Sequence, residues 1–205
     1  MSRKPAKTSR QNAAPREGNQ RVIRTRDELG AALVKLMQER PFDEITVQHV
    51  LDRAGVSRST FYTHYSDKND LFMGDVEDFW QGMATLLSRR GEASNRVAPV
   101  RELFAHIAEM HEFYGSLVAS GKIHDVLELG QGHFARGIEQ RLAELLPADA
   151  TAPLLRTARA QALAGALLAL MSWWIGRGTS SSPEQMDDLY HQIVWSGVSI
   201  PAGKK

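Results

Sequence analysis

The chain has 205 residues, of which 42% are hydrophobic and 24% are charged, and its formal net charge is +1. This length allows one large or two small domains with a hydrophobic core, and the composition is that of an ordinary soluble globular protein. Cysteine is absent, which excludes disulfides, thiol-based redox sensing and metal sites that use cysteine ligands.

The charge is unevenly distributed along the chain. Residues 1–68 carry 13 Lys and Arg against 8 Asp and Glu, whereas residues 69–205 carry 12 against 16. A basic N-terminal part joined to a mildly acidic remainder predicts that the N-terminal part faces nucleic acid and that the remainder has another task.

Residues 1–23 predict a disordered basic tail, because they are polar, contain proline and show no apolar period. Two interpretations of this tail are open: a solvated segment, or an arm that follows DNA phosphates or enters the minor groove. The tail has no apolar core typical of a secretory signal, so we expect a cytoplasmic protein. The first helix is expected to begin at Thr25, where Thr25-x-x-Glu28 has the form of a capping box, and to end at Pro41.

Residues 46–72 predict a helix-turn-helix followed at once by the start of another helix. The first helix of the motif carries one apolar face at positions i, i+3, i+4 and i+7, namely Val47, Val50, Leu51 and Ala54. Thr46 stands where an N-cap is expected, and Gly55 supplies the permissive backbone of a sharp turn. Ser57 can cap the second helix, in which only Phe61 is clearly apolar. A short helix with one buried side chain and many hydrogen-bonding ones suits a DNA groove.

The second helix of the motif holds the candidates for base reading. Arg58 can bond the edge of a guanine with two donors, and the methyl group of Thr60 is available to a thymine. Ser59 and Thr60 are short enough to let the helix approach the bases closely. Two interpretations of Thr46 and Ser57 are equally open: these residues only cap their helices, or they cap the helices and also contact DNA. Thr25 is a further candidate for a contact with the DNA backbone.

The same region resembles the DNA-binding domain of the TetR family of bacterial transcriptional regulators. The resemblance lies in the run from Gly55 to Leu71, with its core Thr60-Phe61-Tyr62-x-His64-Tyr65-x-x-Lys68-x-x-Leu71. The preceding Pro41-Phe42-Asp43-Glu44-Ile45-Thr46-Val47 resembles the family's link between its first and second helices. The resemblance covers about residues 24–72, and several spaced residue types match at once.

The resemblance implies roles for individual residues in DNA binding. It implies that Tyr62, His64 and Lys68 contact phosphates and that Thr46 and Gln48 are lesser contacts. Hydroxyl, imidazole and ammonium donors near helix N-termini are suited to phosphate oxygens. The candidate DNA-binding residues are therefore Thr25, Thr46, Gln48, Ser57, Arg58, Ser59, Thr60, Tyr62, His64 and Lys68.

The rest of the chain predicts further helices and no convincing strand. These helices are expected near residues 66–90, 99–121, 122–130, 132–146, 152–176 and 182–197. The expected fold is all-α, with a three-helix DNA-binding domain over residues 24–70 and a larger helical domain for effector binding and dimerisation over residues 71–200.

The segment 158–175 is apolar nearly all round, so it is expected to bury more than one face. Its uncharged run is just short of the ~20 apolar residues of a membrane-spanning helix, and we expect a buried helix and no membrane partner. A central core helix and a dimer surface are both compatible with this pattern. The family resemblance implies a four-helix homodimer interface, in which Trp174 and Trp195 are candidate anchors.

The middle helices carry many wide apolar side chains with histidines among them. The resemblance implies an effector pocket here, and a methionine and aromatic lining favours a flat hydrophobic or aromatic small molecule. Such residues at helical spacing are more often plain core, and both interpretations are open. The candidate lining residues are Phe79, Trp80, Met83, Phe104, His106, Met110, Phe113, Tyr114 and Phe134.

No motif in the chain supports an enzyme, a cofactor or a metal. The Gly-x-Ser-x-Gly elbow and the Gly-rich phosphate loops are absent, so no catalytic residue is assigned. His106 and His111 are five positions apart and face different sides of a helix, and two ligands do not make a metal site.

Together with the family resemblance, these patterns predict a dimeric, sequence-specific regulator of transcription that binds a palindromic operator in double-stranded DNA. The resemblance implies a repressor that a small-molecule effector releases from DNA. Two other functions are compatible with the same fold. One is a protein that organises DNA without sequence preference, and the other is a coactivator that keeps the helix-turn-helix fold but recruits a protein partner.

Overall fold

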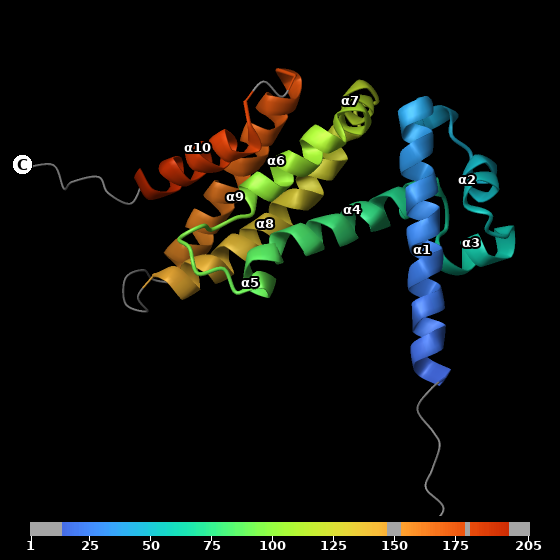
Figure 1. Cartoon of the computed structure of the whole chain (residues 1–205), viewed down its shortest axis with the longest axis horizontal. Helices are drawn as coiled ribbons and strands as arrows, with labels where there is room; N and C mark the ends of the chain where they lie inside the picture. Colours follow the sequence, from blue (N-terminus) through green and yellow to red (C-terminus); the bar gives the residue numbers. More distant parts are fainter. Residues whose placement is uncertain (1–13, 147–152, 179–180, 197–205) are drawn as a thin grey trace, which may run out of the picture.

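The computed structural model describes residues 14–146, 153–178 and 181–196, which form helices and the connections between them, without a strand (Figure 1). The all-α class and the helix-turn-helix predicted from the sequence are confirmed. In chain order the helices are α1 (Ala14–Glu39), η1 (Phe42–Glu44), α2 (Val47–Ala54), α3 (Arg58–His64), α4 (Lys68–Ala84), α5 (Leu86–Arg90), α6 (Val100–Glu109), α7 (His111–Ala119), α8 (Ile123–Leu145), α9 (Pro153–Gly176) and α10 (Pro183–Ser196).

The helices gather at the two ends of α4, as Figure 1 shows. Helix α1 lies across the first turns of α4, with α2 and α3 packed beside it as the N-terminal group. Helices α5 to α10 form the C-terminal group, in which α8 packs along α4, α10 packs on α6, and α7 also contacts α1. Helix α3 therefore lies on the side of the molecule away from α8, α9 and α10. Because α4 contacts both the N-terminal and the C-terminal group of helices, a movement of the middle of α4 can be transmitted to either group.

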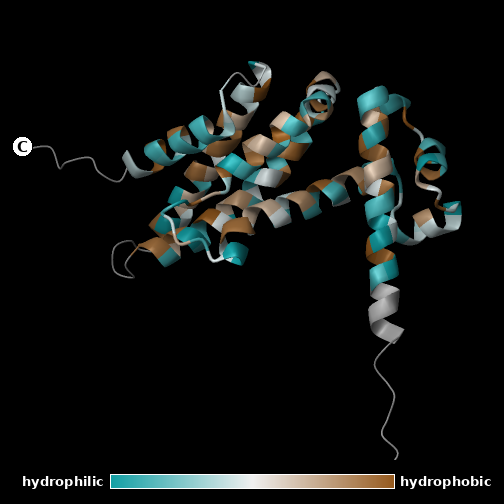
Figure 2. Ribbon diagram, viewed as in Figure 1, coloured by the Kyte–Doolittle hydropathy of each residue, from teal (hydrophilic) through white to brown (hydrophobic). Residues whose placement is uncertain are grey.

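The core of the N-terminal group follows from the apolar faces predicted for its helices. Leu29, Leu33 and Leu36 of α1 are buried in the same hydrophobic cluster as Ile45 of the connection and Phe61 of α3. Figure 2 shows hydrophobic and hydrophilic residues alternating along α1, as is typical of a helix with one buried face. This shared core sets the position of α3 relative to α1.

Helix α1 begins earlier than the sequence predicts. It starts at Ala14, so the last part of the predicted disordered tail is helical and Thr25 lies inside the helix instead of at its N-cap. The carboxylate of Glu28 does not close a capping box with Thr25, because it accepts a hydrogen bond from Arg24 Nε at 2.9 Å. Once a helix is nucleated, each added residue gains a hydrogen bond at little cost, so the packed half of α1 supports its extension. Residues 1–13 of the predicted tail lie outside the described residues.

Three boundaries of the later helices also differ from the prediction. The helix predicted over residues 66–90 is divided at Thr85 into α4 and α5. The N-cap of α4 is Asp67 and not Ser66, because Asp67 Oδ1 accepts hydrogen bonds from the N–H groups of Asn69 (2.7 Å) and Asp70 (2.9 Å). The helix predicted to follow Pro99 is divided at Met110 into α6 and α7.

The break predicted near Gly130 is absent, since α8 is one continuous helix. Gly130 marks a close approach between helices. A Cβ atom at this position would lie 2.8 Å from Cε2 of Trp80, so only glycine lets the indole of α4 pack on the backbone of α8. The missing side chain therefore serves a tertiary contact that the local sequence does not reveal.

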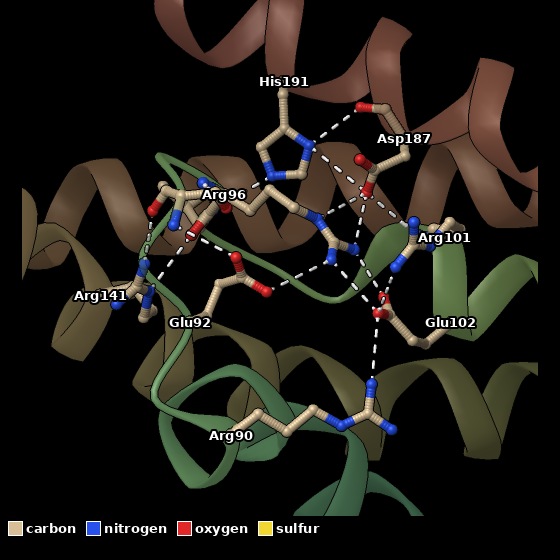
Figure 3. A network of polar contacts seen from close by, with 10 residues as sticks. Arg90, Glu92, Arg96, Arg101, Glu102, Arg141, Asp187 and His191 are labelled. Carbon is tan, nitrogen blue, oxygen red and sulfur yellow. Dashed lines mark hydrogen bonds and ion pairs between the residues drawn. The ribbon is translucent and has the colours of Figure 1, made fainter.

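A half-buried ionic network attaches α10 to α6 (Figure 3). Arg96, in the loop before α6, pairs with Glu102 of α6 and with Asp187 of α10. The backbone N–H of Val97 donates to His191 Nε2 at 3.1 Å. Although burial opposes ionisation of Glu102, the hydrogen bond from Arg96 lowers its pKa to about 2, so the ion pair persists at neutral pH. This network holds α10 in place beside α6.

Helix α9 is long and apolar enough, by length and composition alone, to cross a membrane. In the folded chain one of its faces packs on α8 and α6, and Ala164, Leu167 and Met171 are buried there. A helix in the core of a water-soluble protein satisfies the same criteria of length and hydropathy. Its opposite face is not covered by the described residues.

Candidate DNA interface and internal cavity

Hydrogen bonds within the motif set the ends of α2 and α3. Thr46 and His49 form a capping box at the start of α2, in which the N–H of His49 donates to Thr46 Oγ1 at 3.2 Å. Gly55 ends α2 with a φ of 68°, a left-handed conformation that glycine adopts without strain. The N–H of Thr60 donates to Ser57 Oγ at 3.2 Å, which caps α3. The capping roles predicted for Thr46 and Ser57 are thus confirmed.

A single buried side chain anchors α3. Phe61 is fully buried and packs near Tyr65, with their ring centroids 5.9 Å apart. The predicted DNA-binding residues on α3 lie around it, with Arg58, Ser59 and Tyr62 exposed and Thr60 and His64 half-buried. The helix therefore presents a continuous polar surface to solvent.

Arg58 lies over the junction of the two motif helices. One of its terminal nitrogens donates to Gln48 Oε1 at 2.8 Å, and Gln48 Nε2 donates to Asp52 Oδ1 at 2.7 Å. Both Arg58 and Gln48 are exposed. The structure thus brings these two predicted DNA contacts, ten residues apart in sequence, into one hydrogen-bonded unit on the outer surface.

The hydroxyl groups at the start of α3 bond to one another. Ser57 Oγ lies 3.0 Å from Ser59 Oγ and 2.8 Å from Thr60 Oγ1. Tyr62 is 51% exposed, and its ring meets Phe61 edge-on at a centroid distance of 5.3 Å. Within the described part of the chain no group hydrogen-bonds the Tyr62 hydroxyl, so this hydroxyl is available to a ligand.

Lys68 lies at the start of α4 with its ammonium group turned toward the protein. Its Nζ donates to the carbonyl oxygens of Phe42 (2.8 Å), Asp43 (3.2 Å) and Ile45 (2.7 Å), and it lies 4.6 Å from the centroid of the Phe42 ring. These bonds use all three donors of the ammonium group. A phosphate contact by Lys68 stays a prediction, and it would compete with these three bonds.

Helix α1 adds basic residues to this surface that the assignment of binding residues did not include. Arg21 and Thr25 line a hollow with Ser59, Thr60 and His64 of α3. Arg24 lines a second hollow, which also extends to Gly55 and Ser57. The only sequence signal was the excess of Arg in the N-terminal segment, because the distance between α1 and α3 depends on the tertiary fold.

Arg26 connects α1, α3 and α4. Its Nε donates to the Tyr65 hydroxyl at 3.0 Å, and its terminal nitrogen pairs with Asp78 at 2.8 Å. The hydrogen bond to Tyr65 and the nearby acidic groups raise the pKa of Arg26 above its ordinary value. Because Tyr65 is the C-cap of α3, this contact ties the end of the motif to the middle of α4.

A cavity of about 170 Å³ lies between α1, α4, α6, α7 and α8. Five of the predicted pocket residues line it, namely Phe79, His106, Met110, Phe113 and Tyr114. The sequence did not point to the other lining residues, which are Leu33, Val34, Phe72, Asp75, Val76, Leu117 and Val126. The remaining predicted pocket residues, Trp80, Met83, Phe104 and Phe134, are not among the lining residues.

The predicted pocket aromatics outside the cavity belong to the core. Trp80 is fully buried, and its indole N–H donates to the carbonyl oxygen of Val126 at 2.8 Å. Phe134 packs edge-on against Trp80, and Phe104 packs edge-on against Trp174. Because helical spacing shows only that a residue faces inward, it does not distinguish a cavity wall from a filled core.

Among the described residues, Asp75 is the one carboxylic acid that lines this cavity. Burial, and next the charge of Asp78, raise its pKa to about 7. Its position three residues after Phe72 and four before Phe79 places it on the apolar face of α4, so the helical period could have identified it. Burial lowers the pKa of His106 on the opposite wall, so that imidazole is neutral at neutral pH.

An apolar surface on α9 and α10 remains exposed. Trp173, at 46% exposure, and Ile193, at 51%, are among its large side chains. Four small residues of α9 are exposed at helical spacing, namely Ala158, Ala162, Ala166 and Ala169. The prediction that Trp174 anchors an interface is wrong, because this side chain is buried against Phe104. Trp195 is half-buried and packs against the core.

Residues 29–73 match the family model described as bacterial regulatory proteins, tetR family. An uncharacterised HTH-type transcriptional regulator of Bacillus subtilis, YxbF, is 23% identical over 175 residues, which are 82% of this chain and 43% of that protein. The chain therefore spans less than half the length of this relative.

Two solved structures share the fold over nearly their whole length. The dihydroxyacetone kinase operon activator DhaS is 17% identical, with a TM-score of 0.65 over 85% of this chain and 96% of that one. A TetR transcriptional regulator from Streptococcus agalactiae is 24% identical, with a TM-score of 0.52 over 88% of this chain and 98% of that one. At these identities the likeness establishes the arrangement of helices.

Proposed function

Because residues 29–73 carry the DNA-binding domain of a TetR-family transcriptional regulator, we propose that this protein binds a palindromic operator as a homodimer and represses transcription. Its place of action is the cytoplasm, where bacterial DNA lies. The observation that carries the proposal is the surface of α3, where one buried side chain, Phe61, holds an otherwise polar helix against the domain.

In the proposed complex α3 lies in the major groove of DNA. Arg58 reads a base edge, and Ser59 and Thr60 allow the helix to approach closely. Tyr62 and His64 bind phosphates, which orient the helix without reading sequence. The exposed hydroxyl of Tyr62 supports this assignment, since it is free to meet a phosphate oxygen.

The exposed face of α9 and α10 supports the proposed homodimer. One short recognition helix contacts only a few base pairs, so a specific site usually needs two such helices about 34–36 Å apart. Small residues such as Ala162 and Ala166 would let a helix of the partner approach closely, while Trp173 and Ile193 would supply large apolar area. A second copy of the chain would cover the face of α9 that is exposed in the single chain.

We expect the substitution Ala166→Glu to convert the protein from a dimer to a monomer, because it places a charge in the centre of the proposed interface. Analytical ultracentrifugation measures the change in mass, and circular dichroism verifies that the helices are kept. Ala31→Glu is the matched control, since Ala31 is exposed on α1, outside the proposed interface. A wild-type monomer, or a dimer that survives Ala166→Glu, would contradict this interface.

Repression is proposed because a dimer bound across a promoter blocks polymerase without any further contact. The fold itself does not distinguish repression from activation, since one protein that shares it is named an activator. A reporter gene placed behind the selected operator shows directly whether the protein represses or activates transcription. Higher expression in the absence of the protein supports repression, and lower expression contradicts it.

We further propose that a small molecule in the cavity controls DNA binding. The cavity is lined by Leu33 and Val34 of α1 on one side and by residues of α4, α6, α7 and α8 on the other. A ligand that prefers one arrangement of these helices shifts the population toward that arrangement. Because α1 and α3 share a core, the spacing of the two recognition helices can change in consequence, which would release the operator.

The test of DNA recognition is selection of bound fragments from a random duplex library at one salt concentration. We expect the wild type to enrich an inverted repeat and Tyr62→Ala to lose this enrichment. Tyr62→Phe is the matched variant, because it removes only the hydroxyl and keeps the ring against Phe61. Binding without enrichment would instead support a protein that organises DNA without sequence preference. Failure of the wild type to bind any duplex would support a protein-recruiting coactivator.

A further inference from the structure

The inner face of α4 carries an acidic side chain that has no hydrogen-bond donor. Asp75 lines the cavity and is half-buried, and no described residue donates a hydrogen bond to its carboxylate. Its Oδ2 lies against α1, where a Cβ atom on Gly30 would be only 2.2 Å away. Partial burial of an acidic group without a hydrogen-bond donor is unfavourable. The charge of Arg26 offsets this only in part, because the pKa of Asp75 stays raised, so a further positive charge would stabilise this carboxylate.

The ionisable groups around Asp75 do not supply that charge from within the cavity. On α1, Arg26 directs its guanidinium to Tyr65 and Asp78, and Asp27 adds a second negative charge nearby. On α4, Asp78 is also acidic. On α6, burial lowers the pKa of His106, so the imidazole across the cavity is neutral. The local balance is therefore negative whenever Asp75 is ionised.

The other residues that line the cavity are suited to binding an aromatic ring. Phe79, Phe113 and Tyr114 surround the space, together with aliphatic residues of α1 and α4. The faces of aromatic rings attract cations. The cavity, at about 170 Å³, is close to the roughly 150 Å³ of a cavity that holds benzene. One ring with a short side chain is therefore the size of ligand that fits.

We propose that this cavity binds a small hydrophobic cation, an arylalkyl amine, whose ammonium group pairs with Asp75 and whose ring packs among Phe79, Phe113 and Tyr114. The proposal of a cation site depends only on these contacts, whereas the role of the bound amine as an effector rests on the proposed function. Binding of the ligand would act on the DNA-binding helices through the contact between Asp75 and Gly30. Helix α1 carries this contact and also contributes to the hydrophobic cluster that contains Phe61 of α3.

Three probes of similar shape and different charge test the site in the full chain. They are 2-phenylethylamine, 2-phenylethanol and phenylacetate, which are cationic, neutral and anionic near neutral pH. Isothermal titration at pH 8 is expected to give an affinity for the amine at least about tenfold higher than for the alcohol, with phenylacetate weakest.

Two substitutions assign the charge preference to one carboxylate. Asp75→Asn keeps the shape of the side chain and is expected to abolish the preference for the amine while binding of the alcohol remains. Glu77→Gln is the matched control, since Glu77 lies on the same helix, outside the cavity lining and apart from the groups that shift the pKa of Asp75, and this variant is expected to keep the preference. Because Asp75→Asn removes a buried acidic group, we also expect it to unfold at a higher temperature than wild type at pH 8, which verifies its folding.

The amine affinity should also depend on pH in a defined direction. Asp75, whose pKa is raised to about 7 by burial and by Asp78, is mostly protonated at pH 6 and mostly ionised at pH 8. The amine affinity is therefore expected to increase roughly tenfold over this interval, while the affinity for the alcohol stays constant. Asp75→Asn should remove this dependence.

Equal affinities for amine and alcohol, no binding of any probe, or an amine preference that survives Asp75→Asn would each overturn the cation site. The proposed function is tested separately, by adding the amine to the protein bound to its selected operator. If the amine binds through Asp75 without changing operator affinity, the cation site holds and its role as an effector fails.

Discussion

Replacing Lys68 by methionine is expected to lower the free energy of unfolding by about 2–4 kcal/mol. The substitution keeps the length and apolar part of the side chain but removes the ammonium group that bonds the carbonyl oxygens of Phe42, Asp43 and Ile45. Hydrogen bonds to a charged group contribute about 1.5–3 kcal/mol each when buried, and less here because Lys68 is partly exposed. Urea unfolding followed by circular dichroism measures the change.

Lys35→Met is the control for this measurement. Lys35 is exposed on α1, and its replacement is expected to change stability by less than about 0.5 kcal/mol. A structural role and a phosphate contact give different results for Lys68. If Lys68→Met leaves stability unchanged but reduces the salt dependence of DNA binding by about one unit, the residue acts on phosphate. A loss of stability would show that its three internal bonds hold the link between α1 and α2.

Arg58→Ala is expected to cost about 1–3 kcal/mol in operator binding, a factor of roughly 5 to 150 in Kd. The reason is the loss of two donors to a base edge, with relaxed base preference at one position in each half-site. In the free protein one donor of Arg58 bonds Gln48, so DNA binding would replace or extend this contact. Fluorescence anisotropy with the selected operator and with single-base variants measures both effects.

Arg58→Lys separates charge from base reading. Lysine keeps the positive charge but lacks the planar pair of donors, so we expect the base preference to relax while affinity for random duplexes is retained. Arg53→Ala is a second control, because Arg53 pairs with Glu39 of α1. If Arg58→Ala weakens all duplexes equally and leaves base preference intact, Arg58 positions the helix and does not read a base.

The helix-turn-helix could be predicted because its determinants are close together in the chain. Thr46 and Ser57 cap the helices that follow them, and Gly55 adopts the left-handed conformation between the helices. Each of these interactions joins residues within one or two helical turns. Local hydrogen bonds and backbone preferences therefore define the ends of both helices, so the motif can be predicted without knowledge of tertiary contacts.

Predictions were less accurate where a residue type has two structural uses. Two separate helices were predicted over residues 122–130 and 132–146, but α8 is one continuous helix in which Gly130 serves a close contact with Trp80. Trp174 was interpreted as an interface anchor, but it is buried beside Phe104, and its neighbour Trp173 is exposed instead. A shift of one residue around a helix turns a side chain by about 100°, so an apolar run by itself does not specify which tryptophan faces outward.

The sequence by itself determined the all-α class, the motif between Thr46 and His64, and the polar character of its second helix. Periodicity and capping act over a few residues, so they can be interpreted without coordinates. Only the tertiary structure decided that Arg58 meets Gln48, that Lys68 bonds three carbonyl oxygens, and that Asp75 lies in an apolar cavity beside Gly30. These contacts depend on the distances and angles between packed helices, which follow from how whole side-chain surfaces fit together and not from any single segment.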